Sequence, residues 1–309
     1  MEGIRIFCPA TIANISCGFD VLGLALDGVG DEMILRKTNT PGIRITKISG
    51  QQLPLETDQN VAGVAVKAFL KEYAYSGGLE IEIEKKIKPG SGIGSSAASA
   101  AGAVSGLNLL LGEPFSKHEL IPFAMEGEKL ASGVAHADNV APALLGGFTL
   151  VRSYEPLDVI KLNTPGQLHA SIIHPQIEVK TADSRKILKT QISLKDGIRQ
   201  WGNVGGLVAG LYTEDYGLIS RSLEDHIVEP IRSMLIPGYE KLKIAAKEAG
   251  ALGVGISGSG PSVFALSKGS ARAMEVAEAF RKAYTTIAVP FEIHVSKINL
   301  EGIKILEKW

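Results

Sequence analysis

The residues best suited to chemistry form one short loop, residues 88–98, which reads KPGSGIGSSAA. Glycine lets a backbone turn sharply and approach a ligand closely. A helix that begins near Ser95 would direct its free N–H groups and the positive end of its dipole into this loop. Loop and helix end together predict a phosphate site, with serine hydroxyls as further donors and as an oxygen ligand for Mg²⁺. The alternative is a Gly/Ser turn without a ligand, because short glycine-rich matches arise by chance.

Other nucleotide-binding patterns do not fit the sequence. The Walker pattern ends in Gly-Lys-Ser/Thr, whereas Gly94 is followed by Ser95 and Ser96, and a protein kinase would need its strand lysine and a His-Arg-Asp segment. Residues 253–258 match the dinucleotide pattern G-x-G-x-x-G. However, a predicted helix precedes them and a predicted strand follows, which is the reverse of the required order. We expect a tight turn there that can approach a phosphate or a substrate.

The elements that would position the loop follow from hydrophobic periodicity. Residues 79–84 alternate between apolar and acidic, which predicts a half-buried strand, and residues 95–111 predict a helix of small residues that ends at Gly112. Strands and helices mix without strict alternation, which indicates an α+β fold. Further strands are expected over 4–8, 31–37, 43–48, 147–154, 170–174, 253–257, 262–266 and 291–296, and further helices over 61–73, 116–130, 141–145, 183–188, 198–212, 239–249 and 270–284.

Length and composition indicate a two-domain globular protein. A chain of 309 residues with 45% hydrophobic and 21% charged residues suits two sizeable cores. The prolines within residues 155–167 predict the joint, with domains over 1–155 and 156–309. A net charge of −1 without a basic tract gives no sign of nucleic-acid binding, and no apolar run has membrane-spanning length. The start of the chain lacks a signal-peptide core, and only Cys8 and Cys17 are cysteines, so we expect a reducing, cytoplasmic setting.

Three segments resemble the motifs of the GHMP kinases, a family of small-molecule kinases. Residues 9–14 (PATIAN) with Gly18-Phe19-Asp20 resemble the first motif, residues 89–98 the ATP-binding loop, and residues 255–261 (GISGSGP) the third motif. They occur in the family's order and span nearly the whole chain. The resemblance implies an N-terminal α+β domain, a C-terminal ferredoxin-like domain and an active site in the cleft between them. Members are often homodimers.

Within this family the chain is most similar to the members that phosphorylate L-homoserine on its side-chain hydroxyl, in threonine biosynthesis. The similarity rests on residues 14–23, on residues 136–142 (HADNVAP), on Thr181 with Arg185, and on residues 229–232 (EPIR). Ile93 stands where many members have Leu or Met. Ser16-Cys17 replaces a commoner Gly-Pro beside the substrate, so the sequence does not fix the shape of the substrate site at these two residues.

The resemblance implies that ATP and Mg²⁺ are bound. Ser96 and Glu128 would hold the metal, although a carboxylate beside Lys129 could equally be a solvated helix residue. Asn60 would contact adenine, and its spacing also suits a helix N-cap. The implied nucleotide-binding residues are Asn60, Lys88, Pro89, Gly90, Ser91, Gly92, Ile93, Gly94, Ser95, Ser96, Ala97, Ala98 and Ser99.

Homoserine is a zwitterion, so its carboxylate needs a cationic donor fork and its ammonium an acceptor. Arg185 and Arg232 match the family's substrate arginines, and Asp20 is the candidate for the ammonium. The alternatives are two surface arginines at helix ends and a turn aspartate. The expected substrate-binding residues are Asn14, Asp20, Asn139, Arg185, Arg232 and Thr181.

The sequence offers no clear general base. The residues expected around the reacting hydroxyl are His136, Asp138 and Asn139. The favoured mechanism is direct in-line attack on the γ-phosphate, with the developing charge stabilised by Mg²⁺, loop N–H groups and the helix dipole. A role for Asp138 as the base ranks second. The rival functions are another small-alcohol kinase of mevalonate type, and a member of the fold that binds a ligand without catalysis.

Overall fold

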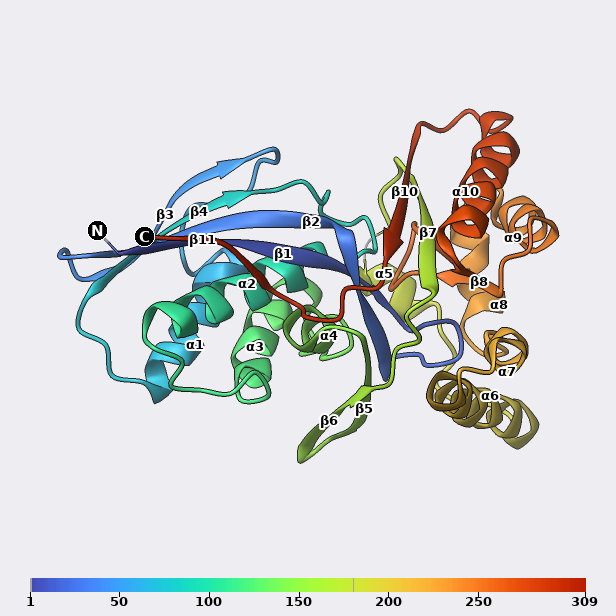
Figure 1. Ribbon diagram of the computed structural model, residues 1–309, viewed down its shortest axis with the longest axis horizontal. Coiled ribbons are helices and arrows are strands. Elements are labelled where there is room, and N and C mark those ends of the chain that lie inside the picture. The colour runs from blue at the N-terminus through green and yellow to red at the C-terminus, as the bar shows by residue number, and fades with distance from the viewer. Residues whose placement is uncertain (1, 180) are drawn as a thin grey trace.

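Two β-sheets, each covered by helices on one face, form the framework of the computed structural model, which describes residues 2–179 and 181–309 (Figure 1). The first sheet has the strand order β11-β1-β2-β4-β3, and β5 and β6 extend it from β2. Its strands are β1 (Gly3–Ala13), β2 (Leu22–Thr38), β3 (Gly42–Ser49), β4 (Gly78–Glu84), β5 (Phe148–Tyr154), β6 (Leu157–Leu162) and β11 (Lys304–Lys308).

The long strand β2 holds the first sheet together. Its C-terminal half pairs antiparallel with both β1 and β4, and its first residues pair with β5. Four helices lie below this sheet in Figure 1: α1 (Val61–Glu72), α2 (Ser95–Leu110), α3 (Leu120–Ser132) and α4 (Val140–Leu145). Helix α2 is buried along almost its whole length because its first turns carry only Ser, Ala and Gly. Its N-terminus is thereby fixed at the end of the sheet, where the predicted phosphate loop lies.

The second sheet is antiparallel, with the order β10-β7-β9-β8. Its strands are β7 (Leu168–Pro175), β8 (Gly253–Ile256), β9 (Val263–Lys268) and β10 (Phe291–Lys297). Helices α9 (Tyr239–Glu248) and α10 (Ser270–Thr285) pack on one side and bury an apolar cluster around Phe280 and Tyr284. The remaining helices are α5 (Thr181–Lys186), α6 (Leu194–Thr213), α7 (Tyr216–Ser222) and α8 (Glu229–Arg232), followed by the 3-10 turn η1 (Ser233–Leu235).

The α+β architecture is confirmed, but the chain crosses the expected boundary at residue 155 twice. The proline-rich segment 155–167 contains β6, which forms a hairpin with β5 and so stays in the first sheet. At the end of the chain, β11 returns to pair with β1. Backbone N–H groups of Asp27 and Gly28 also donate to the Ser296 hydroxyl at 2.8 and 3.0 Å, which ties the two sheets together. No helix within the described ranges is long and apolar enough to cross a membrane.

Candidate active site

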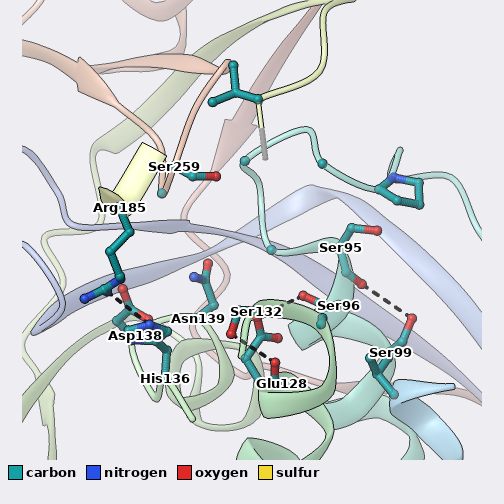
Figure 2. Close-up of a pocket in the computed structure, with 18 of the residues that line it drawn as sticks. Ser95, Ser96, Ser99, Glu128, Ser132, His136, Asp138, Asn139, Arg185 and Ser259 are labelled. Carbon is teal, nitrogen blue, oxygen red and sulfur yellow. Dashed lines mark hydrogen bonds between the residues drawn. The ribbon is translucent and has the colours of Figure 1, made fainter. Parts of the chain in front are cut away.

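A cavity of about 510 Å³ opens where the two sheets meet. Figure 2 shows its layout: Arg185, His136 and Asp138 lie at one end, Ser95 and Ser99 at the other, and Asn139, Ser96 and Glu128 between them. The expected residues on the cavity wall are Asn14, Asp20, Pro89, Gly90, Gly92, Gly94, Ser95, Ser96, Ser99, Glu128, His136, Asp138, Asn139, Arg185 and Arg232. Residues far apart in the sequence therefore form one site.

The glycine-rich loop packs directly against the other two motifs. Gly94 has φ +70° and precedes α2, and a Cβ atom there would lie 1.9 Å from the Thr11 hydroxyl. Gly92 has φ +82°, and a Cβ atom there would lie 2.6 Å from the carbonyl oxygen of Gly260. The Ser257 hydroxyl donates to the Gly92 carbonyl at 2.7 Å. Only glycine fits these close approaches with a left-handed backbone. Because Gly94 has no side chain to cap α2, the first-turn N–H groups remain available to an anion.

A buried ion pair beneath the loop was missed by the sequence analysis. Lys85 and Asp31 each expose only 1% of their side chains and form a salt bridge. The Lys85 ammonium also donates to the Ser95 carbonyl oxygen at 2.8 Å and to the Ser99 hydroxyl at 3.1 Å. The second oxygen of Asp31 accepts from the backbone N–H of Ile87 at 2.9 Å. The sequence contained a signal for this burial. Every second residue of the alternation over 79–84 is buried, and Lys85 occupies the next buried position.

Glu128 and Ser96 meet where a metal ion would be needed. The Ser96 hydroxyl donates to Glu128 Oε1 at 3.1 Å, and Glu128 Oε2 is buried without a hydrogen-bond partner in the structure. Burial raises the pKa of Glu128, an effect opposed by the hydrogen bond from Ser96. Glu128 is thus no solvated helix residue. An unpartnered carboxylate oxygen beside a hydroxyl fits Mg²⁺, which takes a few protein oxygens and completes its shell with water and phosphate.

The two arginines converge on the loop of the first motif. Arg185 Nη2 donates to Asp20 Oδ1 and Oδ2 at 2.8 and 2.7 Å and lies 3.1 Å from His136 Nε2. Arg232 is only 3% exposed, and its Nη1 donates to the Gly258 carbonyl oxygen at 3.0 Å. Both guanidinium groups lie over the ring of Phe19, at 5.3 and 4.9 Å from its centroid. Burial lowers the pKa of Arg232 to about 10, so it stays charged at neutral pH.

Asn14 shapes the loop that carries Asp20. Its backbone is left-handed (φ +72°), and so is that of Asp20 (φ +61°). The Asn14 amide donates to the Gly258 carbonyl oxygen at 2.9 Å and accepts from the Asp20 N–H at 3.0 Å. The Tyr154 hydroxyl, unnoticed in the sequence, donates to the Asp20 carbonyl oxygen at 2.9 Å. Asn14 therefore joins the first and third motifs, which positions the Asp20 carboxylate.

Asp138 is a second buried acid of the cavity. It is 4% exposed, and its Oδ1 has no hydrogen-bond partner in the structure. Burial raises its pKa to about 7, and the neighbouring carboxylates of Asp20 and Glu128 add to the shift. The next residue, Asn139, accepts a hydrogen bond from the Thr11 hydroxyl at 2.7 Å. Burial lowers the pKa of His136, which Asp20 partly offsets, so His136 is neutral near pH 7.

Several expected nucleotide residues do not line the cavity. Asn60 caps α1 through Ala62 N–H at 3.0 Å, and its amide donates to the Pro54 carbonyl oxygen at 2.8 Å. Lys88 instead donates to Gln176 Oε1 at 2.9 Å. Ser91, Ile93, Ala97 and Ala98 are buried in the packing beneath the loop. The side chain of Thr181 lies outside the described residues. The wall residues that the sequence analysis missed are Leu53, Val61, Lys85, Ala131, Ser132, Glu178 and Val179.

Comparison with known proteins identifies the family of the chain. Residues 60–147 match the GHMP kinases N terminal domain, and residues 207–286 match the GHMP kinases C terminal family. Fold and site thus define a two-domain kinase of small molecules, and the chain belongs to the GHMP kinase family. A homoserine kinase of Chloroherpeton thalassium is 47% identical over 99% of this chain and 100% of its own, and one of Xylella fastidiosa is 38% identical over 98% and 94%.

Solved structures give the same result. The crystal structure of homoserine kinase from Cytophaga hutchinsonii has a TM-score of 0.95 and 52% sequence identity, and the match covers 99% of this chain and 98% of that one. Mevalonate kinase of Methanococcus jannaschii, at 15% identity and a TM-score of 0.70, shares the fold.

The ion pair beneath the loop gives the first prediction. Lys85→Met leaves the Asp31 carboxylate buried without its cation and should lower the free energy of unfolding by about 3–5 kcal/mol. Adding Asp31→Asn should recover part of that loss. The matched control is Lys86→Met, which removes a half-exposed partner of Glu32 and should cost at most about 1 kcal/mol. Urea unfolding measures all three, and equal losses for Lys85→Met and Lys86→Met would contradict the assignment.

The raised pKa of Asp138 gives the second prediction. Between roughly pH 4 and 7 the folded state keeps a proton that the unfolded state has lost, so this group makes stability fall as pH rises. One bound proton makes the free energy of unfolding fall by about 1.4 kcal/mol per pH unit. Asp138→Asn should remove this slope, while the exposed control Asp58→Asn should keep it. Urea unfolding across this range tests it, and an unchanged slope in Asp138→Asn would refute it.

Proposed function

We propose that this enzyme transfers the γ-phosphoryl group of ATP to the side-chain hydroxyl of L-homoserine, giving O-phospho-L-homoserine for threonine biosynthesis. The observation that carries the proposal is the cluster of Arg185, Arg232 and Asp20 on the cavity wall, in which Arg185 lies at the end away from Ser95 and Ser99. Full-length similarity to homoserine kinases supports it. The buried thiols of Cys8 and Cys17 support our placement of the enzyme in the reducing cytoplasm.

Substrate recognition needs one partner for each charge of the zwitterion. The arginine fork suits a carboxylate, and the Asp20 carboxylate suits an ammonium. Asp20 and Arg185 already lie in contact, so both ends of the amino-acid group have a partner within one small space. A mevalonate-type substrate has a carboxylate but no ammonium, so it would give Asp20 no partner beyond Arg185. This difference favours homoserine over the mevalonate-type alternative.

The nucleotide phosphates would occupy the opposite end, over the loop and the first turn of α2. The N–H groups of this turn and the positive end of the α2 dipole supply positive potential there. We propose that Ser96 and Glu128 bind Mg²⁺, which would neutralise phosphate charge when present. Leu53 and Val61 offer an apolar wall for the base, and the adenine contact of Asn60 stays a prediction.

The hydroxyl of homoserine would then lie between these two ends, near Asn139 and Asp138. In-line attack forms the new bond to phosphorus as the bond to ADP breaks, and charge on the phosphoryl oxygens is stabilised by loop N–H groups. The hydroxyl proton needs an acceptor at that stage. Asp138, whose pKa is about 7, could receive it, which strengthens the second-ranked mechanism of the sequence analysis. A loss of about 10²–10⁴-fold in Asp138→Asn would identify a base, and a smaller loss a charge-stabilised attack without one.

The third prediction concerns the substrate. ADP release measured by a coupled assay should rise above the ATPase background with homoserine, and much less with mevalonate, galactose or serine. Turnover with mevalonate or galactose but not with homoserine would overturn the proposal.

Arg185→Lys supplies the residue-level arm of the same assay. Lysine keeps the positive charge but loses the planar fork, so KM for homoserine should rise about tenfold or more while KM for ATP changes little. The exposed control Arg221→Lys on α7 should leave both constants unchanged. An effect confined to ATP would instead assign Arg185 to the phosphates.

The fourth prediction concerns the metal. Glu128→Gln removes a charged oxygen ligand without changing size, so kcat should fall about 100-fold, and Mg²⁺ should strengthen ADP binding less than in the unaltered protein. Calorimetry with and without Mg²⁺ directly measures how much the metal strengthens ADP binding. Glu126→Gln, on the exposed face of the same helix, is the matched control. Full activity of Glu128→Gln at low Mg²⁺ would show that Glu128 is not a ligand.

A further inference from the structure

The hydroxyl of Tyr154 joins two segments of the cavity that lie far apart in the sequence. It donates to the carbonyl oxygen of Asp20 at 2.9 Å and accepts from the backbone N–H of Ala137 at 3.3 Å. Asp20 lies just before β2, whereas Ala137 directly precedes Asp138 in the connection between α3 and α4. One side chain therefore contacts both the loop that carries the Asp20 carboxylate and the segment that carries Asp138.

A phenol hydroxyl suits this bridge because it donates one hydrogen bond and accepts another. The two backbone groups that it joins have opposite needs, since one is a carbonyl oxygen and the other an N–H. Burial raises the pKa of Tyr154 above its ordinary value, and the charge of Asp138 adds to the shift, so the hydroxyl keeps the proton that it donates. Phenylalanine at this position would remove the partner of the Ala137 N–H, and Ala137 is fully buried.

Tyr154 belongs to the first sheet, which fixes its place relative to Asp20. It is the last residue of β5 and pairs with Leu157 in the hairpin that β5 forms with β6 (Figure 1). Strand β5 also pairs with the start of β2. The Val151 N–H donates to the carbonyl oxygen of Val21, the residue after Asp20, at 2.8 Å. The position of the Tyr154 hydroxyl beside the loop of Asp20 thus follows from strand pairing.

The segment between α3 and α4 contacts the same sheet at two further points. A Cβ atom at Gly23 on β2 would lie 1.8 Å from the carbonyl oxygen of Asp138, so the backbone of Asp138 packs directly on this strand. The Thr11 hydroxyl on β1 donates to Asn139 Oδ1 at 2.7 Å. Of these three contacts, only that of Tyr154 also holds the loop that precedes β2.

We infer that Tyr154 is a positioning residue that sets the separation between the ammonium site and the site of the reacting hydroxyl. The inference rests on the function proposed above, in which Asp20 binds the ammonium of homoserine and the hydroxyl lies near Asp138 and Asn139. Homoserine spans this separation with a short carbon chain, so a displacement of either segment would weaken the contacts at one end. A misplacement of about 1 Å is enough to lower a rate about 100-fold.

Tyr154→Phe and L-2-aminobutyrate test this inference together. The variant keeps the ring and loses only the hydroxyl, and aminobutyrate is homoserine without its hydroxyl, so it uses the amino-acid end alone. In calorimetry with ADP and Mg²⁺ present, homoserine should bind about tenfold more weakly to Tyr154→Phe than to the unaltered protein, and aminobutyrate less than about threefold more weakly. With homoserine and ATP, kcat should fall about 100-fold while KM for ATP stays unchanged.

Tyr75→Phe is the matched control, because the Tyr75 hydroxyl also donates to a backbone carbonyl oxygen, that of Gly78 at 3.2 Å, away from the cavity wall. It should leave both affinities and kcat unchanged. Equal weakening of homoserine and aminobutyrate in Tyr154→Phe would indicate a general structural role and overturn the inference, as would unchanged binding of both. If the unaltered protein neither binds nor phosphorylates homoserine, the proposed function fails and the inference fails with it.

Discussion

The buried pair of Lys85 and Asp31 is the constraint on which the phosphate end of the site depends. It joins β2, the end of β4 and the first turns of α2 through one ammonium and one carboxylate. Two ions in a dry interior are stable only if their remaining hydrogen-bonding capacity is satisfied, and here both are satisfied by the backbone and hydroxyl groups of the loop region. The position of the loop is therefore set by the same contacts that make the ion pair tolerable.

Two acids elsewhere on the cavity wall have the opposite character, because one carboxylate oxygen of each lacks a partner. Asp138 Oδ1 and Glu128 Oε2 are both buried without one in the structure, and burial raises the pKa of both groups. Buried unpaired acids lower stability, and proteins keep such groups where a ligand, a metal or a proton compensates them. The phosphate end satisfies its charges internally, whereas Asp138 and Glu128 leave an oxygen for the reactants.

Regular elements with clear periodicity were predictable from the sequence. The alternation over 79–84 gave β4, and the small residues from Ser95 onward gave α2 with nearly the observed ends. Strand β6 was missed because Pro156 and Pro165 indicated a linker, although both lie outside the strand itself. Strand β11 is mostly exposed and pairs with β1 across the whole chain, so no local pattern revealed it. Both strands follow residue 155 and yet belong to the first sheet.

The site residues also divide into those that a local pattern predicts and those that depend on contacts distant in the sequence. The loop glycines were predicted from their own residue types, and Glu128 and the arginines from the resemblance to a family; the structure brings them to one cavity. Lys85 and Tyr154 act through partners distant in the sequence. Asn60 shows the limit of a motif, because one spacing suits both a nucleotide contact and the N-cap that the structure contains.

The substrate end explains how one pocket can favour a neutral zwitterion over a simple anion. Arg185 and Arg232 bring two positive charges and Asp20 one negative charge, and Phe19 covers both guanidinium groups. A zwitterion leaves this balance unchanged, since each of its charges gains a partner. A simple carboxylate would share the two arginines with Asp20 but would bring no ammonium for Asp20, so it would gain one charged contact where a zwitterion gains two. Selection at this end therefore follows from the charge that Asp20 adds beside Arg185, more than from the shape of the cavity.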